Sequence, residues 1–367
     1  MDIIFYWLTM GPYHYARMNA IENVASEVNL KVIEACNNDD HNWKSFPPKD
    51  FEHLTLLPGK KLSAAVVRQA AGKLPQAVDN SRCDIFVNGA GYFHLSMIKP
   101  VINFKRNNIS TVLWSESTRV DQPRSIWKEF LKRRVISLYD AAIVAGKKHQ
   151  NYMQKLGMDA ENIKQVGNVV DNDYYASNVR SNKRGFVYIG RFLPIKNISL
   201  LVRAYHRYRR KCINMSSTPL PLRLVGDGPV MAEIKQLIDK ENISGITLTG
   251  MLQPEEVKKE YAKSSVLILP SISEPWGLVI NEAMASGLAV VASDRCGANP
   301  ELVEHGNNGY IFDPENIEEL CDYMMKFSED PDLSKQMGAR SLEIIKQFSP
   351  SAYAEACYQF FGKLINK

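Results

Sequence analysis

The sequence predicts an α/β protein of two domains, each built on a parallel β-sheet with crossover helices. Short apolar runs rich in β-branched residues alternate with helical segments along the whole chain, as in buried parallel strands joined by helices. A polar stretch rich in Asn and Ser, residues 171–184, separates two such series. With 367 residues, the chain is long enough for two domains that each bury a core. We therefore expect two Rossmann-like domains that face a ligand-binding cleft.

Each expected strand is an apolar run bounded by polar or turn residues. The first series has strands at 3–7, 31–36, 53–57, 84–88, 111–115, 142–145 and 163–166. The second series has strands at 185–189, 222–225, 246–249, 266–269, 289–292 and 310–312. The expected domains are residues 1–170 and 171–349, and a last helix at 351–366 follows a Ser-Pro break.

The composition excludes several classes of protein. The chain has 45 Lys and Arg against 40 Asp and Glu, a balance that does not call for nucleic acid as a partner. Its six cysteines are scattered without a Cys-x-x-Cys pair, which indicates free thiols and not a disulfide framework or a zinc site. The amino terminus lacks the basic region of a signal peptide, and no apolar run is long enough to cross a membrane. We therefore expect a cytoplasmic protein.

Two acidic residues flank the start of a predicted helix in the second domain. Glu274 lies in the loop after strand 266–269, and Glu282 lies in the first turns of a helix at 278–286 that Gly287 ends. Ligands of open α/β sheets bind outside the carboxyl ends of the strands, where helix N-termini attract anions. Carboxylates there can accept hydrogen bonds from neighbouring sugar hydroxyls, so the pair suggests a nucleotide sugar. The alternative is that Glu274 caps the helix and Glu282 is a solvated helix residue.

The segment that begins at Glu274, E-P-W-G-L-V-I-N-E-A-M-A-S-G-L-A-V-V-A-S-D, resembles the E-x7-E motif of the retaining glycosyltransferases of family four, which have the GT-B fold. The likeness continues through residues 296–303 and 306–310. It implies that Glu282 holds the donor ribose and that Glu274 contacts the transferred sugar. It also implies that the first domain binds the acceptor and that residues 350–367 pack back on it. The motif backbone is expected to contact the sugar and phosphates at Pro275, Trp276, Gly277 and Leu278.

Two cations follow the first strand of the second domain. Arg191 and Lys196 stand in the run G-R-F-L-P-I-K that begins at Gly190, whose missing side chain permits a turn. Arg can grip a diphosphate with two hydrogen bonds, and Lys can act on it as a point charge. The run resembles the family's G-R-L-x-x-x-K segment, which implies that both residues hold the leaving diphosphate; the alternative is two solvated basic residues. The same resemblance makes Met251 and Leu252 the nucleobase contact.

Three positions of the first domain are candidate site residues. Gly11 lies in the loop after the first strand, which in the family closes over the phosphates. His14 either touches the substrate or caps and packs against the next helix. Glu116 follows strand 111–115, where relatives commonly carry a histidine near the reacting sugar. We expect Glu116 to orient or deprotonate the acceptor hydroxyl, or else to cap a helix.

Residues 99–148 form a basic region, with eleven Lys or Arg against four acidic residues. Within it, residues 125–135 are predicted to be a basic amphipathic helix. Its apolar positions share one face: Trp127, Leu131, Val135 and Leu138. One interpretation is docking to an anionic membrane that carries a lipid-linked acceptor. The other is a helix packed on the sheet with a solvated basic face.

These features together predict the retaining transfer of a hexose-type sugar from a nucleoside-diphosphate sugar, with a UDP-sugar favoured, to a hydroxyl acceptor. The expected setting is polysaccharide, glycolipid or glycoconjugate assembly, with a saccharide or lipid-linked acceptor, in the cytoplasm or at the inner face of the membrane. The resemblance implies no cofactor and no metal, and we find no Asp-x-Asp pair outside polar loops. The alternatives are a GT-B sugar-nucleotide epimerase or phosphorylase, or a non-catalytic protein that binds nucleotide sugars.

Overall fold

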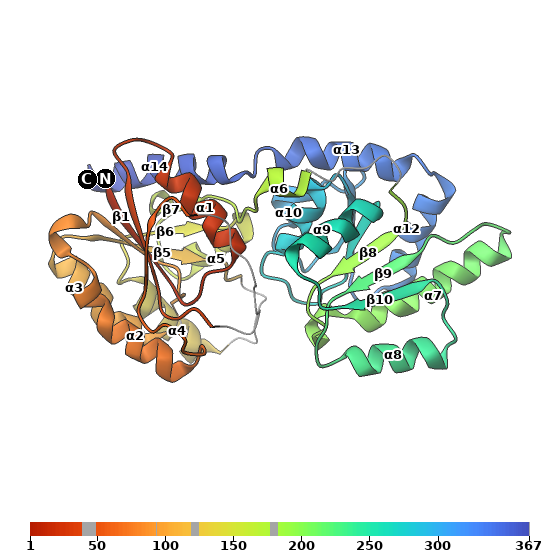
Figure 1. Cartoon of the computed structure of the whole chain (residues 1–367), viewed down its shortest axis with the longest axis horizontal. Coiled ribbons are helices and arrows are strands. Elements are labelled where there is room, and N and C mark those ends of the chain that lie inside the picture. The colour runs from red at the N-terminus through yellow and green to blue at the C-terminus, as the bar shows by residue number, and fades with distance from the viewer. Residues whose placement is uncertain (39–48, 93, 119–124, 177–182, 367) are drawn as a thin grey trace. The chain divides into compact units, whose positions relative to one another are not determined.

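The computed structural model describes residues 1–38, 49–92, 94–118, 125–176 and 183–366. The chain divides into two compact units (Figure 1). The first unit is Met1–Val170 with Ser349–Lys367, and the second unit is Asp171–Phe348. The first unit is therefore discontinuous, because its last helix is made by residues that follow the whole second unit.

The first unit contains, among its described residues, a seven-stranded parallel sheet in the order β3-β2-β1-β4-β5-β6-β7. The chain adds β2 and β3 on one side of β1 and then returns to place β4 on the other side, so the order reverses between β1 and β4. Several strands are buried along their whole length, as expected for a parallel sheet covered on both faces. The strands are β1 (Asp2–Trp7), β2 (Asn29–Glu34), β3 (Glu52–Thr55), β4 (Ile85–Asn88), β5 (Ser110–Ser115), β6 (Ala141–Val144) and β7 (Ile163–Gln165).

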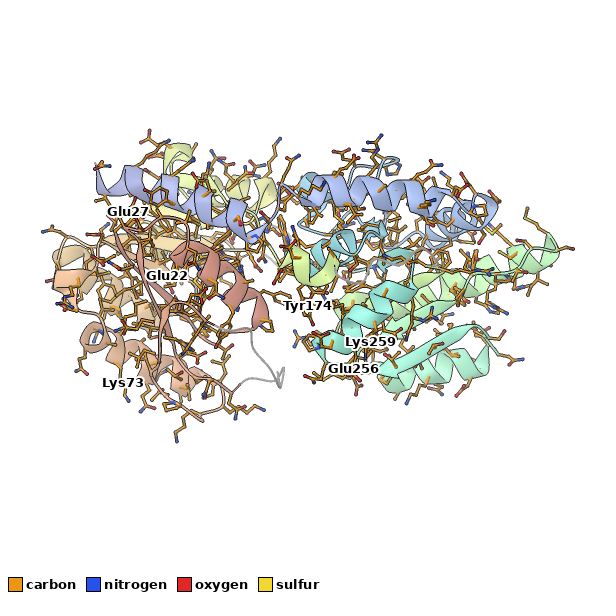
Figure 2. The ribbon with its side chains drawn as sticks, turned by 45° about the horizontal axis from the view of Figure 1, so that its top comes forward. Glu22, Glu27, Lys73, Tyr174, Glu256 and Lys259 are labelled. Atoms are coloured by element: carbon orange, nitrogen blue, oxygen red, sulfur yellow. The ribbon has the colours of Figure 1, made fainter. Side chains whose placement is uncertain are left out.

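The helices of the first unit include one from the end of the chain. They are α1 (Pro12–Glu22), α2 (Ala64–Ala77), α3 (Ile98–Arg106), α4 (Ile126–Ile136), α5 (Lys147–Lys155) and α14 (Pro350–Ile365). Ser349 caps helix α14, since its hydroxyl accepts a hydrogen bond from Ala352 N, and Pro350 fits the first helical position. The helix packs on α1 and β7, and Tyr358 donates a hydrogen bond to Glu27 in the loop after α1 (Figure 2).

The second unit contains, in its described part, a six-stranded parallel sheet in the order β10-β9-β8-β11-β12-β13. The chain runs outward from β8 to β10 and then returns to place β11 on the other side of β8. The strands are β8 (Phe186–Ile189), β9 (Leu222–Val225), β10 (Ile246–Gly250), β11 (Val266–Leu269), β12 (Ala289–Ser293) and β13 (Gly309–Phe312).

The helices of the second unit are α6 (Asn172–Ala176), α7 (Ile198–Asn214), α8 (Met231–Lys240), α9 (Pro254–Lys263), α10 (Leu278–Ala285), α11 (Asn299–Leu302), α12 (Ile317–Glu329) and α13 (Leu333–Ile345). Helix α10 is followed by Gly287, whose φ of +71° is strained for other residues, as its predicted role in ending this helix requires. A Cβ on Gly338 of α13 would lie 2.3 Å from Gly287 O, so this glycine lets α13 pack closely on α10.

The predicted fold class, two α/β domains with parallel sheets, is confirmed, and each expected strand is present within the described residues. The predicted bounds of β9 and β11 are confirmed, and other strand bounds differ by one or two residues, most at β2, which ends at Glu34 and not at residue 36. The pairing continues beyond this end, since Ala35 N and Cys36 N donate to Trp7 O and Leu8 O at 2.9 and 3.1 Å. The expected linker at 171–184 is wrong in part, because α6 lies inside it and packs on α10. Its residues 177–182 lie outside the described residues.

Candidate active site

Two loops of the second unit start where the strand order reverses. Strands β8 and β11 are neighbours, but the chain leaves β8 toward β9 and leaves β11 toward β12, on the opposite side. Ligands of open parallel sheets bind at the carboxyl ends of such strand pairs. The loops span residues 190–197 and 270–277. Ile272 N donates to Ile195 O at 2.9 Å, so the two loops are joined by a backbone hydrogen bond.

An ion pair between Lys196 and Glu274 also joins the two loops. Both side chains are mostly buried, with 17% and 11% of their surfaces exposed. Ser271 Oγ donates to the same carboxylate oxygen, Glu274 Oε2, at 3.3 Å. Because the pair is screened from water, its attraction is stronger than that of a surface pair. Two predicted donor-site residues, 78 positions apart in the chain, are therefore in contact.

The turn after β8 is held rigidly. Tyr188 OH donates to Arg191 O at 3.0 Å, and burial together with the charge of Glu274 raises the pKa of this hydroxyl far above its usual value. A Cβ on Gly226, after β9, would lie 1.9 Å from Gly190 O, so only glycine permits this approach of the two turns. The Arg191 side chain is exposed to solvent, and its backbone is held in place.

The Glu282 carboxylate is part of the core of the second unit. Its side chain is 2% exposed, so the interpretation of Glu282 as a solvated helix residue is wrong. Its Oε2 accepts a hydrogen bond of 2.6 Å from Tyr261 OH, in α9. A buried carboxylate needs such partners, because desolvation otherwise makes its charge costly. Tyr261, which the sequence did not single out, is therefore a neighbour of the predicted ribose contact.

The segment between the two acidic residues is anchored by Trp276. This side chain is buried, and its Nε1 donates to Asn281 Oδ1 at 2.9 Å. The loop after β12 supports the segment, since Gly297 N donates to Glu274 O at 2.9 Å and Ala298 N donates to Trp276 O at 3.2 Å. Gly277, whose φ of +99° favours glycine, is the N-cap residue of α10. Leu278 is the first residue of this helix.

Met251 and Leu252 follow β10, at the outer edge of the sheet. The Met251 side chain is mostly exposed, whereas Leu252 is half-buried. The turns at the strand ends are connected, because Gly226 N donates to Gly250 O at 2.9 Å. The predicted nucleobase residues therefore lie, like Arg191, at the carboxyl ends of the strands, but they follow β10, which is two strands away from β8.

In the first unit, His14 caps the start of α1. Gly11 N donates to His14 Nδ1 and His14 N donates to Gly11 O, both at 2.9 Å. The imidazole also lies edge-on against Trp7, with ring centroids 4.4 Å apart. Burial lowers the pKa of His14 well below its usual value, and the charge of Arg17 lowers it further. These contacts favour the capping interpretation of His14, and they make Gly11 the residue from which α1 begins.

Glu116 follows β5 and belongs to a polar chain of three residues. Asn168 Nδ2 donates to Glu116 Oε1, and Arg17 donates to Asn168 Oδ1 at 2.7 Å. Arg17 is buried, and burial lowers the pKa of its guanidinium. Its guanidinium lies 5.4 to 5.9 Å from the ring centroids of Trp7, Trp114 and Tyr353. No sequence pattern distinguished Arg17 or Asn168, because their partners come from distant parts of the chain.

The predicted basic helix is α4, and its apolar face is only partly covered. Val135 is buried, but Trp127 and Leu131 are 78% and 57% exposed, and Phe130 is 49% exposed. Val135 and Ile136 pack in a core cluster with Ala142 and Val144 of β6, so the interpretation of α4 as a helix packed on the sheet holds for this end of the helix. The basic residues Lys128, Arg133 and Arg134 are exposed on the same helix. Two more of the basic region, Arg119 and Arg124, lie outside the described residues.

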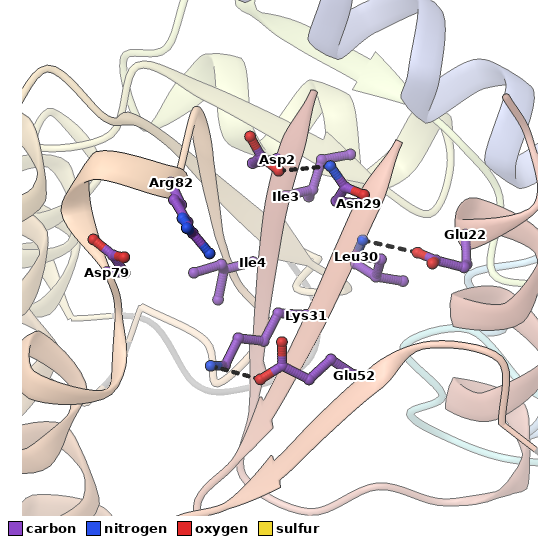
Figure 3. Close-up of a pocket in the computed structure, with 10 residues that line it drawn as sticks. All are labelled: Asp2, Ile3, Ile4, Glu22, Asn29, Leu30, Lys31, Glu52, Asp79 and Arg82. Atoms are coloured by element: carbon purple, nitrogen blue, oxygen red, sulfur yellow. Dashed lines mark hydrogen bonds and ion pairs between the residues drawn. The ribbon is translucent and has the colours of Figure 1, made fainter. Parts of the chain in front are cut away.

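A pocket of about 700 Å³ lies at the first sheet, at the amino ends of its strands (Figure 3). It is lined by residues at the amino ends of β1, β2 and β3, whereas ligands of parallel sheets bind at the carboxyl ends. Several of its polar groups already have partners: Lys31 pairs with Glu52 at 2.8 Å, and Leu30 N donates to Glu22 Oε2 at 2.8 Å. We do not assign the active site to this pocket.

Along the described parts of the chain, no helix combines the length and the apolar character needed to cross a bilayer. Over the same residues, no group of three or more His, Cys, Asp or Glu side chains is arranged to hold a metal ion.

Comparison with known proteins identifies the second unit. Residues 171–343 match the family model described as "Glycosyl transferases group 1". The second unit is a group 1 glycosyl transferase domain. Among solved structures, the whole chain is similar to sucrose-phosphate synthase from Thermosynechococcus elongatus, with a TM-score of 0.76, 18% identity, and coverage of 100% of this chain and 99% of that one. Anabaena HepE in complex with UDP has a TM-score of 0.73 at 18% identity, with 99% and 100% covered. These neighbours establish the GT-B fold.

Curated relatives of the group 1 domain carry glycosyltransferase names. An uncharacterized glycosyltransferase of Methanocaldococcus jannaschii is 30% identical over 163 residues, 44% of this chain and 43% of that protein. Sulfoquinovosyl transferase SQD2 of Arabidopsis thaliana is 24% identical over 320 residues, 83% of this chain and 59% of that protein. The chain spans less than two thirds of the length of these relatives.

The lowered pKa of His14 predicts a pH-dependent stability. The folded protein keeps His14 neutral, whereas the unfolded chain protonates it below about pH 6.5. His14 therefore contributes stability above that pH, and this contribution is lost as the pH falls. We expect the fall in Tm between about pH 8 and about pH 5 to be smaller in His14→Gln than in the native chain.

Differential scanning calorimetry of both proteins across this range checks the prediction. The comparison at the upper pH is the control, because any loss of the cap or of packing against Trp7 is already present there. Parallel Tm profiles of the two proteins would contradict the assignment of a depressed pKa to His14.

Proposed function

We propose that the chain is a retaining glycosyltransferase that moves a hexose-type sugar from a nucleoside-diphosphate sugar to a hydroxyl acceptor. The observation that carries the proposal is the position of Lys196, Glu274 and Glu282 around the reversal of strand order in a group 1 glycosyl transferase domain. The names of its relatives support it, among them sulfoquinovosyl transferase and alpha-D-kanosaminyltransferase. A solved neighbour of the fold, Anabaena HepE, binds UDP and glucose.

In the proposed donor complex, Arg191 and Lys196 bind the diphosphate and Glu282 accepts hydrogen bonds from the ribose hydroxyls. A diphosphate carries more negative charge than one carboxylate, so it competes with Glu274 for Lys196. The ion pair opens as the donor binds, and the Glu274 carboxylate becomes available to hydroxyls of the transferred sugar. The backbone of residues 275–278 and the Gly190 turn approach the sugar and phosphates.

In the proposed reaction, the bond between the anomeric carbon and the diphosphate breaks, and its electron pair leaves with the diphosphate. The acceptor oxygen forms the new bond on the same face, and its proton passes to the departing phosphate oxygen. Arg191 and Lys196 stabilise the negative charge that develops on the leaving group. Because these two cations meet that charge, we propose that the transfer needs neither a metal nor a cofactor.

We propose a UDP-sugar as the donor. Anabaena HepE and S. aureus TarM, two solved neighbours of the fold, are in complex with UDP. Met251 and Leu252 are the proposed neighbours of the base. Backbone groups there would contact the base, so other nucleotides compete in principle, and one relative from Mycobacterium tuberculosis is named as GDP-mannose-dependent. The acceptor belongs to polysaccharide, glycolipid or glycoconjugate assembly in this proposal.

We propose that the first unit binds the acceptor and that Glu116 orients the acceptor hydroxyl, whose proton passes to the departing phosphate oxygen. Glu116 stands at the carboxyl end of β5, and its carboxylate is oriented by Asn168. A carboxylate beside a cation-like sugar also stabilises it electrostatically. Gly11, at the carboxyl end of β1, is the proposed phosphate contact of this unit.

We also propose that α4 binds an anionic membrane, the source of a lipid-linked acceptor. Trp127, Phe130 and Leu131 are exposed large apolar side chains within two turns of one helix. Exposed Lys and Arg residues stand among them, and such a combination favours the boundary between lipid headgroups and acyl chains. We choose an anionic membrane as the partner because its negative charge is opposite to that of the exposed Lys and Arg residues.

Replacement of Glu282 by Ala tests the donor site. Loss of a charged hydrogen-bond acceptor is expected to weaken UDP binding by about 10- to 100-fold, measured by isothermal titration calorimetry. The control is Glu256→Gln, at the start of α9, since Gln can still accept the hydrogen bond from Gln253 N. Unchanged affinities of Glu282→Ala for UDP, GDP and ADP would rule out the proposed donor site.

Replacement of Glu116 by Gln tests the proposed catalytic carboxylate. Gln keeps an acceptor for Asn168 but removes the charge, so kcat is expected to fall by about 10²- to 10⁴-fold with little change in Tm. Steady-state kinetics with the preferred donor gives the measurement. Glu27→Gln, on the surface beside α14, is the control for loss of a carboxylate from this unit. Near-native turnover of Glu116→Gln would remove Glu116 from the mechanism.

Vesicle co-sedimentation tests the proposed membrane surface. We expect the chain to bind phosphatidylglycerol vesicles at low salt, with weaker binding at high salt and none to phosphatidylcholine vesicles. Trp127→Ala should weaken binding by about tenfold, since burial of one large apolar side chain contributes about 1.5 kcal/mol. The control is Ile213→Ala, which removes an exposed apolar side chain from α7. Equal binding to neutral vesicles, or none to anionic ones, would refute the proposal.

A further inference from the structure

We infer that Tyr261 is a positioning residue for ribose recognition and that helix α6 holds Tyr261 in place. This inference rests on the proposed function, because it assigns a role to the partner of Glu282. It concerns the second unit alone, and it names residues that the E-x7-E motif does not include. Tyr261 lies on α9, before β11, whereas the motif starts after β11.

The hydrogen bond between Tyr261 and Glu282 is enclosed. Both side chains are buried, and the 2.6 Å distance from Tyr261 OH to Glu282 Oε2 is short, as expected for a bond to a charged acceptor. The same hydroxyl lies 3.4 Å from Val279 O, in the first turn of α10. A Glu side chain has three rotatable bonds, so a fixed donor on one oxygen restricts the directions that its carboxylate can take. Tyr261 therefore orients the carboxylate toward a pair of hydroxyls before the ligand binds.

Helix α6 packs against this tyrosine. The rings of Tyr175 and Tyr261 meet edge to face, with centroids 6.0 Å apart and an interplanar angle of 83°. Tyr174 packs on Tyr175 in the same way at 5.0 Å, and Lys258 Nζ of α9 lies 4.1 Å from the centroid of the Tyr174 ring. Figure 2 labels Tyr174 beside α9, where Glu256 marks the first turn. Because the Tyr261 side chain is fully buried and packs edge to face on Tyr175, its ring has little freedom to rotate.

Helix α6 is in turn fixed at the point where the chain enters the second unit. Asn172 Nδ2 donates to Ile345 O at 3.0 Å and to Phe348 O at 3.2 Å. Phe348 is the last residue of the second unit, and α6 starts one residue after its first. A continuous series of contacts therefore runs from the two ends of the second unit through Tyr175 and Tyr261 to the Glu282 carboxylate.

The test compares ribose with deoxyribose ligands. Calorimetric titration measures the affinities of the full chain for UDP and GDP and for the deoxyribose analogue of each. We expect the native chain to prefer the ribose form by about tenfold or more, since the analogue lacks one of the hydroxyls that donate hydrogen bonds to Glu282 in the proposed complex. Tyr261→Phe should reduce this preference to about threefold or less, while affinity for the deoxyribose forms changes little.

The matched control is Tyr205→Phe. Tyr205 is equally buried in the second unit, but its hydroxyl donates to backbone carbonyls, Leu220 O at 3.0 Å and Gly245 O at 2.9 Å. The Tyr205→Phe variant should lower Tm without changing the ribose preference. It therefore shows what the loss of a buried hydroxyl does to stability alone. If Tyr261→Phe does not fold, Tyr175→Leu serves in its place, and an intermediate loss of ribose preference is expected.

The outcomes separate the inference from the proposed function. A native chain that binds neither nucleotide, or binds ribose and deoxyribose forms equally, would refute the ribose role of Glu282 and with it the inference. A native chain that prefers ribose, with folded Tyr261→Phe and Tyr175→Leu variants that keep the same preference, would refute the positioning role of Tyr261 and leave the proposed function standing.

Discussion

The reversal of strand order between β8 and β11 is the constraint on which the second unit depends. Because the chain leaves these neighbouring strands toward opposite sides, two loops start together at the centre of one sheet edge. The two loops are joined by the backbone hydrogen bond from Ile272 N to Ile195 O and by the ion pair between Lys196 and Glu274. Irregular loops are usually the mobile parts of a domain. Here the contacts between them make a fixed base from which α10 starts.

The two units bury charge in different ways. In the second unit, Lys196 is paired directly with Glu274, and this arrangement can exchange one anion for another. In the first unit, Arg17 is surrounded by aromatic rings and is linked to Glu116 through Asn168. A guanidinium is weakly hydrated and stacks on ring faces, so burial penalises it less than it would a lysine. The ion pair of the second unit suits a site that binds a charged ligand. The buried Arg17 of the first unit suits a fixed core that orients a side chain at its edge.

Local patterns carried most of what the sequence could predict. Runs of β-branched residues located the strands, and Gly287 located the end of α10, because each depends on neighbours along the chain. The partners of the site residues depend instead on tertiary packing. Periodicity cannot show that Tyr261 meets Glu282 across 21 positions, or that His14 turns back to cap its own helix. Helix α4 shows the same limit, since its apolar face was predictable but the exposure of Trp127 was not.

The discontinuity of the first unit has a consequence for how the chain folds as it is made. Helix α14 supplies Tyr353 to the rings around Arg17, and Phe361 lies 6.3 Å from Phe5 of β1, ring centroid to ring centroid. These residues leave the ribosome only after all of residues 171–348 have been synthesised. Domains usually fold as units in the order of their synthesis. The first unit begins before the second unit but is completed after it. Its hydrophobic core therefore stays partly exposed until α14 has been synthesised.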